Sequence, residues 1–259
     1  MQGDTMRNVQ DSVQEQFGPV AAAYVTSAVH AGGPDLEAMV TAGNLQGTER
    51  VLDVATGAGH TAIAFARQAA EVVAFDLTEA MLATAQNLAA EQGVGNITFV
   101  AGDAGRLPFP DDSFDIVTCR YAAHHFPHPA QAAREWARVL KPGGRLLLVD
   151  IVSPDDPKSD TVLNTAEILR DPSHVRDYSV GQWFTMLEDA GLAVTDAGRF
   201  PLRLVFDNWT ARMRTPEAAA AQIRTLFASA PASVQESLHL EPDGTFTCPV
   251  ALLVCAKAG

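Results

Sequence analysis

The stretch Arg50-Val-Leu-Asp-Val-Ala-Thr-Gly-Ala-Gly-His-Thr-Ala62 joins a short β-rich run to a glycine-rich turn and then to the start of a helical pattern. Glycines at such a turn let the backbone approach a ligand closely, and the N–H groups that open the following helix point toward it. The stretch therefore predicts a β-strand, a ligand-binding loop and a helix, in that order.

The same alternation continues to residue 151, which is typical of a parallel sheet covered by helices. One helical pattern starts after Thr78 and closes at Gly93, and a second starts at Pro129 and ends at a turn over 141–144. Strands are expected at 50–55, 71–76, 96–100, 114–119 and 145–150.

Beyond residue 151 the alternation is weaker. Ser179-Val-Gly-Gln182 is a capping-box pattern ahead of a helix that stops at Gly191. A sixth strand is expected over 192–200 and a last strand over 245–257, with Thr215-Pro-Glu217 opening a further helix between them. The sheet is therefore expected to be completed only by the last strand.

Composition excludes several classes of protein. With 259 residues, 47% of them hydrophobic, the chain can bury a sizeable core, and its net charge of −13 opposes binding to nucleic acid and to anionic membrane surfaces. Cys119, Cys248 and Cys255 form no Cys-x-x-Cys pair, so we expect buried strand thiols. The first residues lack the apolar core of a signal peptide, and no apolar run approaches the roughly 20 residues of a membrane span, so we expect a cytoplasmic protein.

The glycine-rich loop admits two kinds of ligand. Gly57-x-Gly-x-x-Ala62, with Asp76 at the end of the next strand, fits the fingerprint of nicotinamide and flavin enzymes. However, an ionised Asp53 at the end of the first strand would repel a pyrophosphate, whereas S-adenosylmethionine has no phosphate and carries a sulfonium and an ammonium group. Asp76 is placed for two ribose hydroxyls, and Asp103 can accept from an adenine amine. The three acids favour S-adenosylmethionine.

Four stretches resemble the class I S-adenosylmethionine-dependent methyltransferases, and within them the small-molecule branch of ubiquinone/menaquinone C-methyltransferases and many natural-product O-methyltransferases. They are residues 51–59, 73–81, 103 with 107–117, and 138–145. Two further stretches, 119–126 and 170–176, resemble a bacterial subgroup of this branch with no defined function. The resemblance implies an enzyme that uses S-adenosylmethionine, releases S-adenosylhomocysteine and methylates a small molecule, with O-methylation slightly favoured.

The resemblance also implies the architecture, an α/β fold with a Rossmann-like, seven-stranded, mostly parallel sheet, helices on both faces, an antiparallel last strand and helical lid insertions. We expect a single domain over 1–259, as a monomer or a homodimer. Its expected parts are an N-terminal helical flap (1–48), a cofactor-binding core (49–152), lid and substrate-side insertions (153–178 and 202–243), and sheet-completing parts (179–201 and 244–259).

By resemblance, Gly57 and Gly59 surround the methionine part of the cofactor, Leu77 lies beside the adenine, and Ala104 lies with Asp103 at the base. No metal ligand is expected. The expected cofactor-binding residues are Tyr24, Asp53, Ala55, Gly57, Gly59, His60, Asp76, Leu77, Met81, Asp103, Ala104 and Arg120.

A base is needed only if the acceptor holds its proton, because methyl transfer is an in-line displacement that depends mainly on positioning. His124 and His125 follow the fourth strand, and imidazole titrates near neutral pH. In related antibiotic-sugar O-methyltransferases, a His-His pair here and an acid ending strand five have been assigned this role, which transfers to His124, His125 and Asp150 by resemblance. The pair could equally pack or cap a loop.

Several other assignments stay open. The segment around Phe17 is either a flap over the cofactor or a packed helix. Arg120 could face the methionine part with its side chain or, as we favour, with its backbone. A nicotinamide-dependent oxidoreductase and a non-catalytic S-adenosylmethionine-binding protein remain as alternative functions. Four residues of the insertions could hold an anionic or phenolic acceptor or form surface salt bridges, namely Arg170, His174, Arg176 and Trp209.

Overall fold

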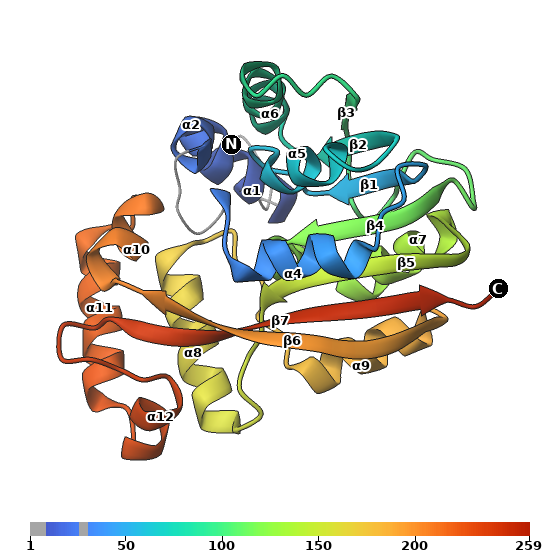
Figure 1. Cartoon of the computed structure of the whole chain (residues 1–259). Helices are drawn as coiled ribbons and strands as arrows, with labels where there is room; N and C mark the ends of the chain where they lie inside the picture. Colours follow the sequence, from blue (N-terminus) through green and yellow to red (C-terminus); the bar gives the residue numbers. More distant parts are fainter. Residues whose placement is uncertain (1–8, 26–30) are drawn as a thin grey trace, which may run out of the picture.

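The computed structural model describes residues 9–25 and 31–259. Within them one sheet has seven strands in the order β3-β2-β1-β4-β5-β7-β6 (Figure 1). Neighbours among β1 to β5 pair in parallel, whereas β7 is antiparallel to both β5 and β6. The expected sheet is thus confirmed, including its antiparallel last strand. The strands are β1 Arg50–Val54, β2 Glu71–Asp76, β3 Ile97–Ala101, β4 Phe114–Arg120, β5 Leu140–Ile151, β6 Leu192–Leu204 and β7 Phe246–Lys257.

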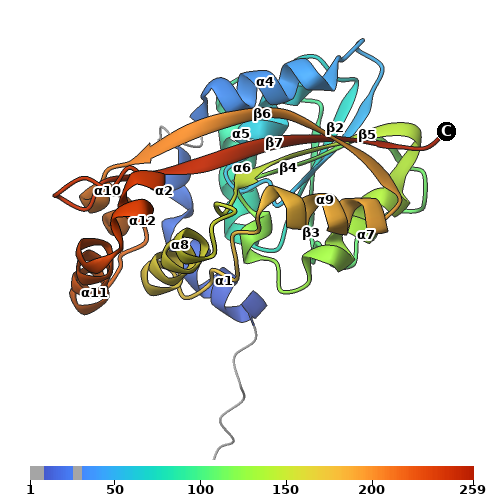
Figure 2. The ribbon, with the colours of Figure 1, turned by 90° about the horizontal axis from the view of Figure 1, so that it is seen from below.

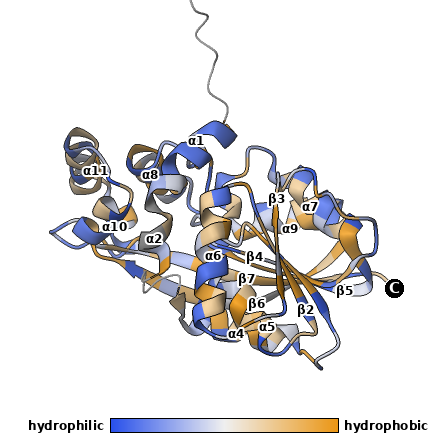
Figure 3. Cartoon of the chain, turned by 90° about the horizontal axis from the view of Figure 1, so that it is seen from above, coloured by the Kyte–Doolittle hydropathy of each residue, from blue (hydrophilic) through white to orange (hydrophobic). Residues whose placement is uncertain are grey.

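Helices cover both faces of the sheet (Figure 2). One face carries α4 (Pro34–Gly43), α5 (His60–Ala66) and α6 (Glu79–Glu91), and the other carries α7 (Pro129–Val139) and α9 (Val180–Asp189). The strands at the centre of the sheet are largely hydrophobic, whereas α1 (Val9–Phe17) is mostly hydrophilic (Figure 3). Apolar residues buried on both faces are what a parallel sheet between two helical layers requires.

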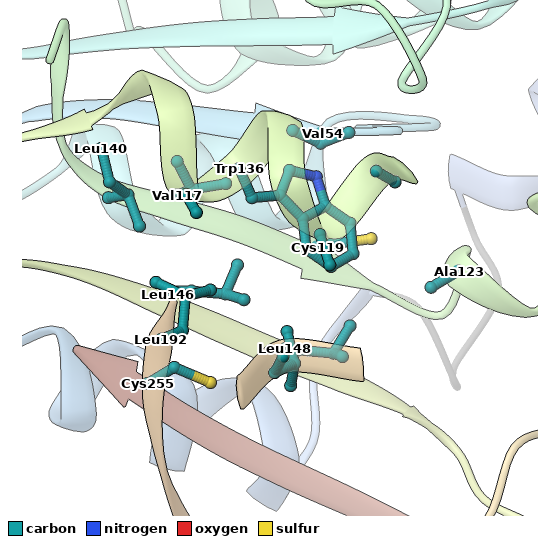
Figure 4. Close-up of a cluster of buried hydrophobic side chains, with 14 of the residues drawn as sticks. Val54, Val117, Cys119, Ala123, Trp136, Leu140, Leu146, Leu148, Leu192 and Cys255 are labelled. Carbon is teal, nitrogen blue, oxygen red and sulfur yellow. The ribbon is translucent and has the colours of Figure 1, made fainter. Parts of the chain in front are cut away.

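The core under α7 and α9 is built around two tryptophans. The fully buried rings of Trp136 and Trp183 stack with their centroids 6.5 Å apart. In Figure 4, Val117 and Cys119 of β4 lie beside Trp136, and Leu146 and Leu148 of β5 lie below them in the same cluster. The three cysteines are buried on β4 and β7 as free thiols, as the sequence predicts.

Local signals place most of the helix ends correctly. Ser179 and Gln182 form both bonds of the expected capping box. Thr78 is the N-cap of α6 as expected, but its buried hydroxyl has no hydrogen-bond partner among the described residues. The expected turn at 141–144 lies inside β5, because Leu140 already pairs with Phe114 and the register shifts before Arg145. The strand therefore begins earlier than the sequence indicates.

The insertions gather beyond the carboxyl ends of the parallel strands (Figure 1). β6 continues past the expected end at residue 200 because it stays paired with β7 as far as Leu204. The helices packed on this extension share one apolar cluster. They are α8 (Pro157–Arg170), α10 (Phe206–Arg212), α11 (Glu217–Ser229) and α12 (Ala232–Ser237).

The N-terminal segment divides in two. α1, the 3₁₀ helix η1 (Gly18–Val20) and α2 (Ala21–Val25) lie at the same end of the sheet as the insertions (Figure 1). α4 instead packs on the sheet through Met39, so this part of the expected flap covers the core. Among the described residues, no helix is both long enough and apolar enough to cross a membrane.

Candidate functional site

A cavity of about 270 Å³ lies at the carboxyl ends of the parallel strands, under α1. Its lining includes ten of the twelve expected cofactor residues, which are Tyr24, Ala55, Gly57, His60, Asp76, Leu77, Met81, Asp103, Ala104 and Arg120. Two lining residues, Ala55 and Tyr121, have positive φ angles of 55° and 52° although they are not glycines. Strained backbone of this kind concentrates at functional sites.

Asp76 organises the glycine-rich loop from the end of β2. Its Oδ2 accepts from the backbone N–H of Gly57 and its Oδ1 from that of Thr78, both at 2.8 Å. Burial raises the pKa of this carboxyl above its ordinary value, and the two N–H bonds work against that rise. Gly57 has a φ of 55°, and a Cβ atom there would meet nothing within 4 Å. Its bare backbone therefore faces open space.

Asp53 does not line the cavity. Its carboxylate is buried behind the loop, where it accepts from the hydroxyls of Thr56 at 2.6 Å and Thr118 at 2.7 Å. Burial raises the pKa of Asp53 to about 6, although both hydroxyl bonds lower it. Contrary to the sequence-based expectation, Asp53 does not face the ligand space, and its carboxylate instead ties the loop to β4.

Gly59 is the second expected residue outside the lining. It has a φ of 88°, and a Cβ atom there would lie 2.8 Å from the Cβ of Ala85 on α6. The glycine is therefore needed for the close approach of the loop and the helix.

Asp103 follows β3 at the open edge of the cavity. It is exposed, and its Oδ1 accepts from the backbone N–H of Gly105 at 2.8 Å. Leu77 and Met81 line the cavity between this edge and the loop. The edge thus combines one exposed carboxylate with apolar side chains.

The N-terminal helices contact the cavity through both side chains and backbone. Gln14 of α1 donates to the carbonyl oxygen of Leu77 at 3.0 Å, and Gln16 donates to that of Met213 at 2.9 Å. The Nε2 of His60 lies 3.1 Å from the carbonyl oxygen of Tyr24, to which it can only donate. These bonds connect α1 and α2 to the cofactor loop and to the insertions.

Arg120 lines the cavity from the end of β4. The guanidinium is buried and forms a salt bridge of 2.7 Å with Asp35 of α4. Asp35 was not anticipated, because nothing in its local sequence connects it to a strand end 85 residues away.

His124 and Asp150 form a close pair. The Nδ1 of His124 lies 2.6 Å from Oδ1 of Asp150, whose Oδ2 also accepts from the backbone N–H of His124. Burial lowers the pKa of His124, but the carboxylate outweighs burial and the resulting value is about 9. At neutral pH His124 is therefore an imidazolium.

His125, in contrast, is a neutral imidazole at neutral pH. Its Nδ1 lies 3.0 Å from the carbonyl oxygen of Ser173, which can only accept, so Nδ1 carries the hydrogen and Nε2 keeps a lone pair. Burial and the neighbouring His124 cation lower the pKa of His125 to about 4. The two ring centroids are 4.3 Å apart. At neutral pH the pair therefore carries a single positive charge, on His124.

A second cavity, of about 60 Å³, adjoins the first. The two cavities share the lining residues Phe17, Tyr24, Tyr121 and His125. The second is otherwise lined by His124, Ile151, Arg170, Asp171, Leu202, Leu204, Trp209 and Arg212. His125 thus stands where the two spaces meet.

The four candidate residues of the insertions separate into two groups. Arg170 and Trp209 line the second cavity, whereas Arg176 pairs with Asp160 outside it. His174 is buried behind the histidine pair, and burial lowers its pKa to about 2. Sequence reasoning missed Arg212, which no motif marks, and assigned no role to Asp171 within the stretch 170–176, and the packing of α8 and α10 places both at this cavity. In the described residues no group of three or more His, Cys, Asp or Glu could hold a metal ion.

Comparison with known proteins assigns the chain to a family. The methyltransferase-domain family matches residues 52–148. YcgJ of Bacillus subtilis (strain 168), named an uncharacterized methyltransferase, is 46% identical over 209 residues, which cover 81% of this chain and 83% of the relative. The chain belongs to the S-adenosylmethionine-dependent methyltransferases.

Two further comparisons agree with this assignment. The crystal structure of B. subtilis YcgJ matches 87% of this methyltransferase and 98% of that chain, with a TM-score of 0.84 and 41% identity. UbiE of Ectopseudomonas mendocina (strain ymp), a ubiquinone/menaquinone biosynthesis C-methyltransferase, is 41% identical over 120 residues, which cover 45% of this chain and 47% of the relative. The cofactor is therefore S-adenosylmethionine and the product S-adenosylhomocysteine, which excludes the nicotinamide alternative.

Proposed function

We propose that this methyltransferase transfers the methyl group of S-adenosylmethionine to a hydroxyl oxygen of a small-molecule acceptor. The larger cavity would hold the cofactor and the second cavity the acceptor. The observation that carries this proposal is the position of His125, which lines both cavities and keeps the lone pair of Nε2. The proton of the hydroxyl and the methyl group would then be handled at the same junction.

The lining of the larger cavity suits the cofactor chemically. The open space at Gly57 leaves backbone next to the ligand, and the Asp76 carboxylate is positioned by two N–H bonds, so that it can accept from ribose hydroxyls. Asp103 at the exposed edge can accept from the adenine amine, with Leu77 and Met81 beside the ring. When bound, the cofactor supplies an electrophilic methyl group on a sulfonium.

His125 would accept the proton of the acceptor hydroxyl at Nε2. A pKa of about 4 keeps this imidazole neutral at neutral pH, so the base form is fully populated. Because its basicity is low, His125 provides little driving force for removing the hydroxyl proton before the reaction. The proton would therefore be transferred to Nε2 while the oxygen attacks the methyl group. Ser173 fixes the tautomer through its carbonyl oxygen.

His124 and Asp150 would act as positioning residues. Their charge-assisted bond of 2.6 Å orients the His124 ring, whose cation adds to burial in keeping His125 unprotonated. Because the pKa of His124 is raised to about 9, the stabilisation from this pair is fully present below about pH 6.5 and is lost as the pH rises through 9. The rate is therefore expected to fall on the alkaline side as the pH rises through about 9, where His124 loses its proton.

The test is turnover of hydroxylated acceptors by wild type and by a pair of matched histidine variants. His125→Asn is expected to lose about 10²- to 10⁴-fold in kcat, with the Kd of S-adenosylhomocysteine nearly unchanged. His239→Asn, at an exposed histidine that lines neither cavity, controls for the loss of an imidazole. A His125→Asn variant within threefold of wild type would show that positioning alone carries the reaction. Tight S-adenosylhomocysteine binding without turnover of any acceptor would favour the non-catalytic alternative.

A further inference from the structure

The second cavity contains a cation, Arg212, whose Nε has no hydrogen-bond partner among the residues that the structure describes. We propose that the acceptor is a small hydroxy acid and that Arg212 binds its carboxylate. This inference rests on the proposed function and names the class of acceptor for the same site. It is carried by the unused hydrogen-bonding groups of the cavity and by the charges around them.

Arg212, at the end of α10, lines the second cavity. Within residues 9–25 and 31–259 its guanidinium makes no hydrogen bond or ion pair, and its Nε is buried with no acceptor in reach. Burial, and then the nearby Arg170 cation, lower the pKa of Arg212 from its ordinary value. Burying a charge without a partner is costly, so a site that does so is expected to receive the partner from a ligand.

The neighbouring arginine is already occupied. Arg170 forms an ion pair of 3.2 Å with Glu167, donates to the carbonyl oxygen of Trp209 at 3.1 Å, and lies over the Trp209 ring. Arg212 is thus the cation of this cavity whose planar fork of donors is available. That fork matches a carboxylate, which can accept two parallel hydrogen bonds.

Asp171 supplies the complementary group. Its Oδ1 accepts from the N–H and the hydroxyl of Ser173, whereas its Oδ2 is buried without a hydrogen-bond partner among the described residues. Although both residues line the cavity, no ion pair joins Asp171 to Arg212. An acceptor that satisfies both needs an anionic group and a hydrogen-bond donor, which a hydroxy acid provides. The Asp171 carboxylate would repel a dianion, so a monoanionic carboxylate fits better than a phosphate.

The remaining walls are apolar or aromatic. Leu202, Leu204, Trp209 and Phe17 line the cavity between the polar groups, so the body of the acceptor is expected to be apolar. A net charge of −13 repels anions from the protein as a whole. Selective binding of an acid must therefore come from a local group.

The experiment compares two probes that have the same shape but different charge. 3-Hydroxybenzoate and its uncharged analogue 3-hydroxybenzamide are titrated calorimetrically into enzyme saturated with S-adenosylhomocysteine. Wild type is expected to bind the acid at least tenfold more tightly than the amide. In Arg212→Met this ratio should fall to about one. Arg214→Met, at an exposed arginine outside the cavity, should keep the wild-type ratio because it removes the same charge nearby.

Folding of the variant is checked independently. Without a probe, Arg212→Met is expected to melt at the same temperature as wild type or higher, because it removes a cation whose Nε is buried without a partner among the described residues. If it does not fold, Arg212→Lys, which keeps the charge but not the fork, is used and should retain only part of the preference for the acid. Wild type that binds the acid no more tightly than the amide, or an Arg212→Met variant that keeps the preference, overturns the inference.

Its failure can be distinguished from failure of the proposed function, because the binding measurement needs no methyl transfer. Arg212-dependent binding of the acid with no transfer to any hydroxyl supports this inference and counts against O-methylation. Transfer to uncharged hydroxylated acceptors, unaffected by Arg212→Met, supports O-methylation and overturns this inference.

Discussion

The two adjoining cavities differ in how the charged groups around them are satisfied. Around the larger cavity, carboxylates are already held by the chain, since Asp76 accepts two N–H bonds and Asp53 two hydroxyl bonds. Around the second cavity, Arg212 Nε and Asp171 Oδ2 are buried without hydrogen-bond partners among the described residues. A site for the common cofactor is thus preorganised, whereas the acceptor site leaves groups for its ligand to complete.

The largest effect is expected at Asp76. Asp76→Ala removes the carboxylate that would accept from two ribose hydroxyls, at roughly 1.5 to 3 kcal/mol for each bond, so cofactor affinity should fall by about two to four orders of magnitude. It also frees the N–H groups of Gly57 and Thr78. The Kd of S-adenosylhomocysteine, measured by calorimetry, tests this assignment.

Asp76→Asn is the matched control, because the amide keeps one acceptor oxygen and the side-chain volume. It should retain part of the affinity. An unchanged Kd in Asp76→Ala would remove Asp76 from the ribose site and would weaken the contrast between the two cavities.

Much of the cofactor half could be predicted from sequence because its signals are local. The glycines at 57 and 59, the acid ending β2 and the helix patterns each act within a few residues. The architecture of the sheet was implied by the family resemblance. Asp53 shows the limit of such reasoning. Its position at a strand end was predicted correctly, but its direction depends on Thr118 of a strand 65 residues away.

The acceptor half could not be predicted in the same way. Arg212 and Asp171 line the same cavity because β6 runs on to Leu204 and carries α10 to the end of α8. No local pattern encodes this packing. The histidine pair could be predicted only in part. Its position after β4 was predicted from sequence, but the cationic state of His124 and the neutral state of His125 depend on Asp150 and on burial.

A second prediction concerns the free energy lost by burying the ionised Asp53 carboxylate behind the glycine-rich loop. Because the folded pKa of Asp53 is raised to about 6, above its ordinary 3.8, the cost is fully present above pH 6 and is relieved as the pH falls toward 4. At about 1.4 kcal/mol per pKa unit, this cost is about 3 kcal/mol. Asp53→Asn should raise the free energy of unfolding near pH 8 and flatten its pH dependence.

Denaturant unfolding of both proteins between pH 4.5 and pH 8 measures this effect. Asp115→Asn is a useful comparison, since hydrogen bonds hold the pKa of Asp115 below its ordinary value and its loss should destabilise at neutral pH. If Asp53→Asn destabilises the protein equally at every pH, the burial of an ionised Asp53 does not lower the free energy of unfolding.

The third prediction concerns the junction between the cavities. Asp150→Asn removes the carboxylate that raises the pKa of His124, so His124 becomes neutral near pH 7.5. The His124 cation, the second cause of the lowered pKa of His125, is then lost while burial remains, so the acid limb of kcat should move up from about pH 4. A kcat loss of about tenfold at pH 7.5 is expected. If the acid limb does not move, the His124–Asp150 pair does not control the protonation of a base in the reaction.

The smallest effect is expected at the flap, which belongs to both cavities because Phe17 and Tyr24 line each of them. Gln14 and Gln16 attach α1 to Leu77 and Met213 through hydrogen bonds that contribute about 0.5 to 1.5 kcal/mol each.

If α1 closes over the cofactor, ligand binding should stabilise this attachment, and S-adenosylhomocysteine should slow hydrogen exchange over residues 9–25. Replacing both glutamines by alanine should weaken S-adenosylhomocysteine binding about threefold to tenfold and reduce that protection, because part of the binding energy is then spent on ordering α1. Gln222→Ala, at an exposed position of α11, should change neither quantity. Exchange that is equally slow with and without ligand would mean that α1 is a fixed wall, and that the two cavities differ in their polar groups but not in their access.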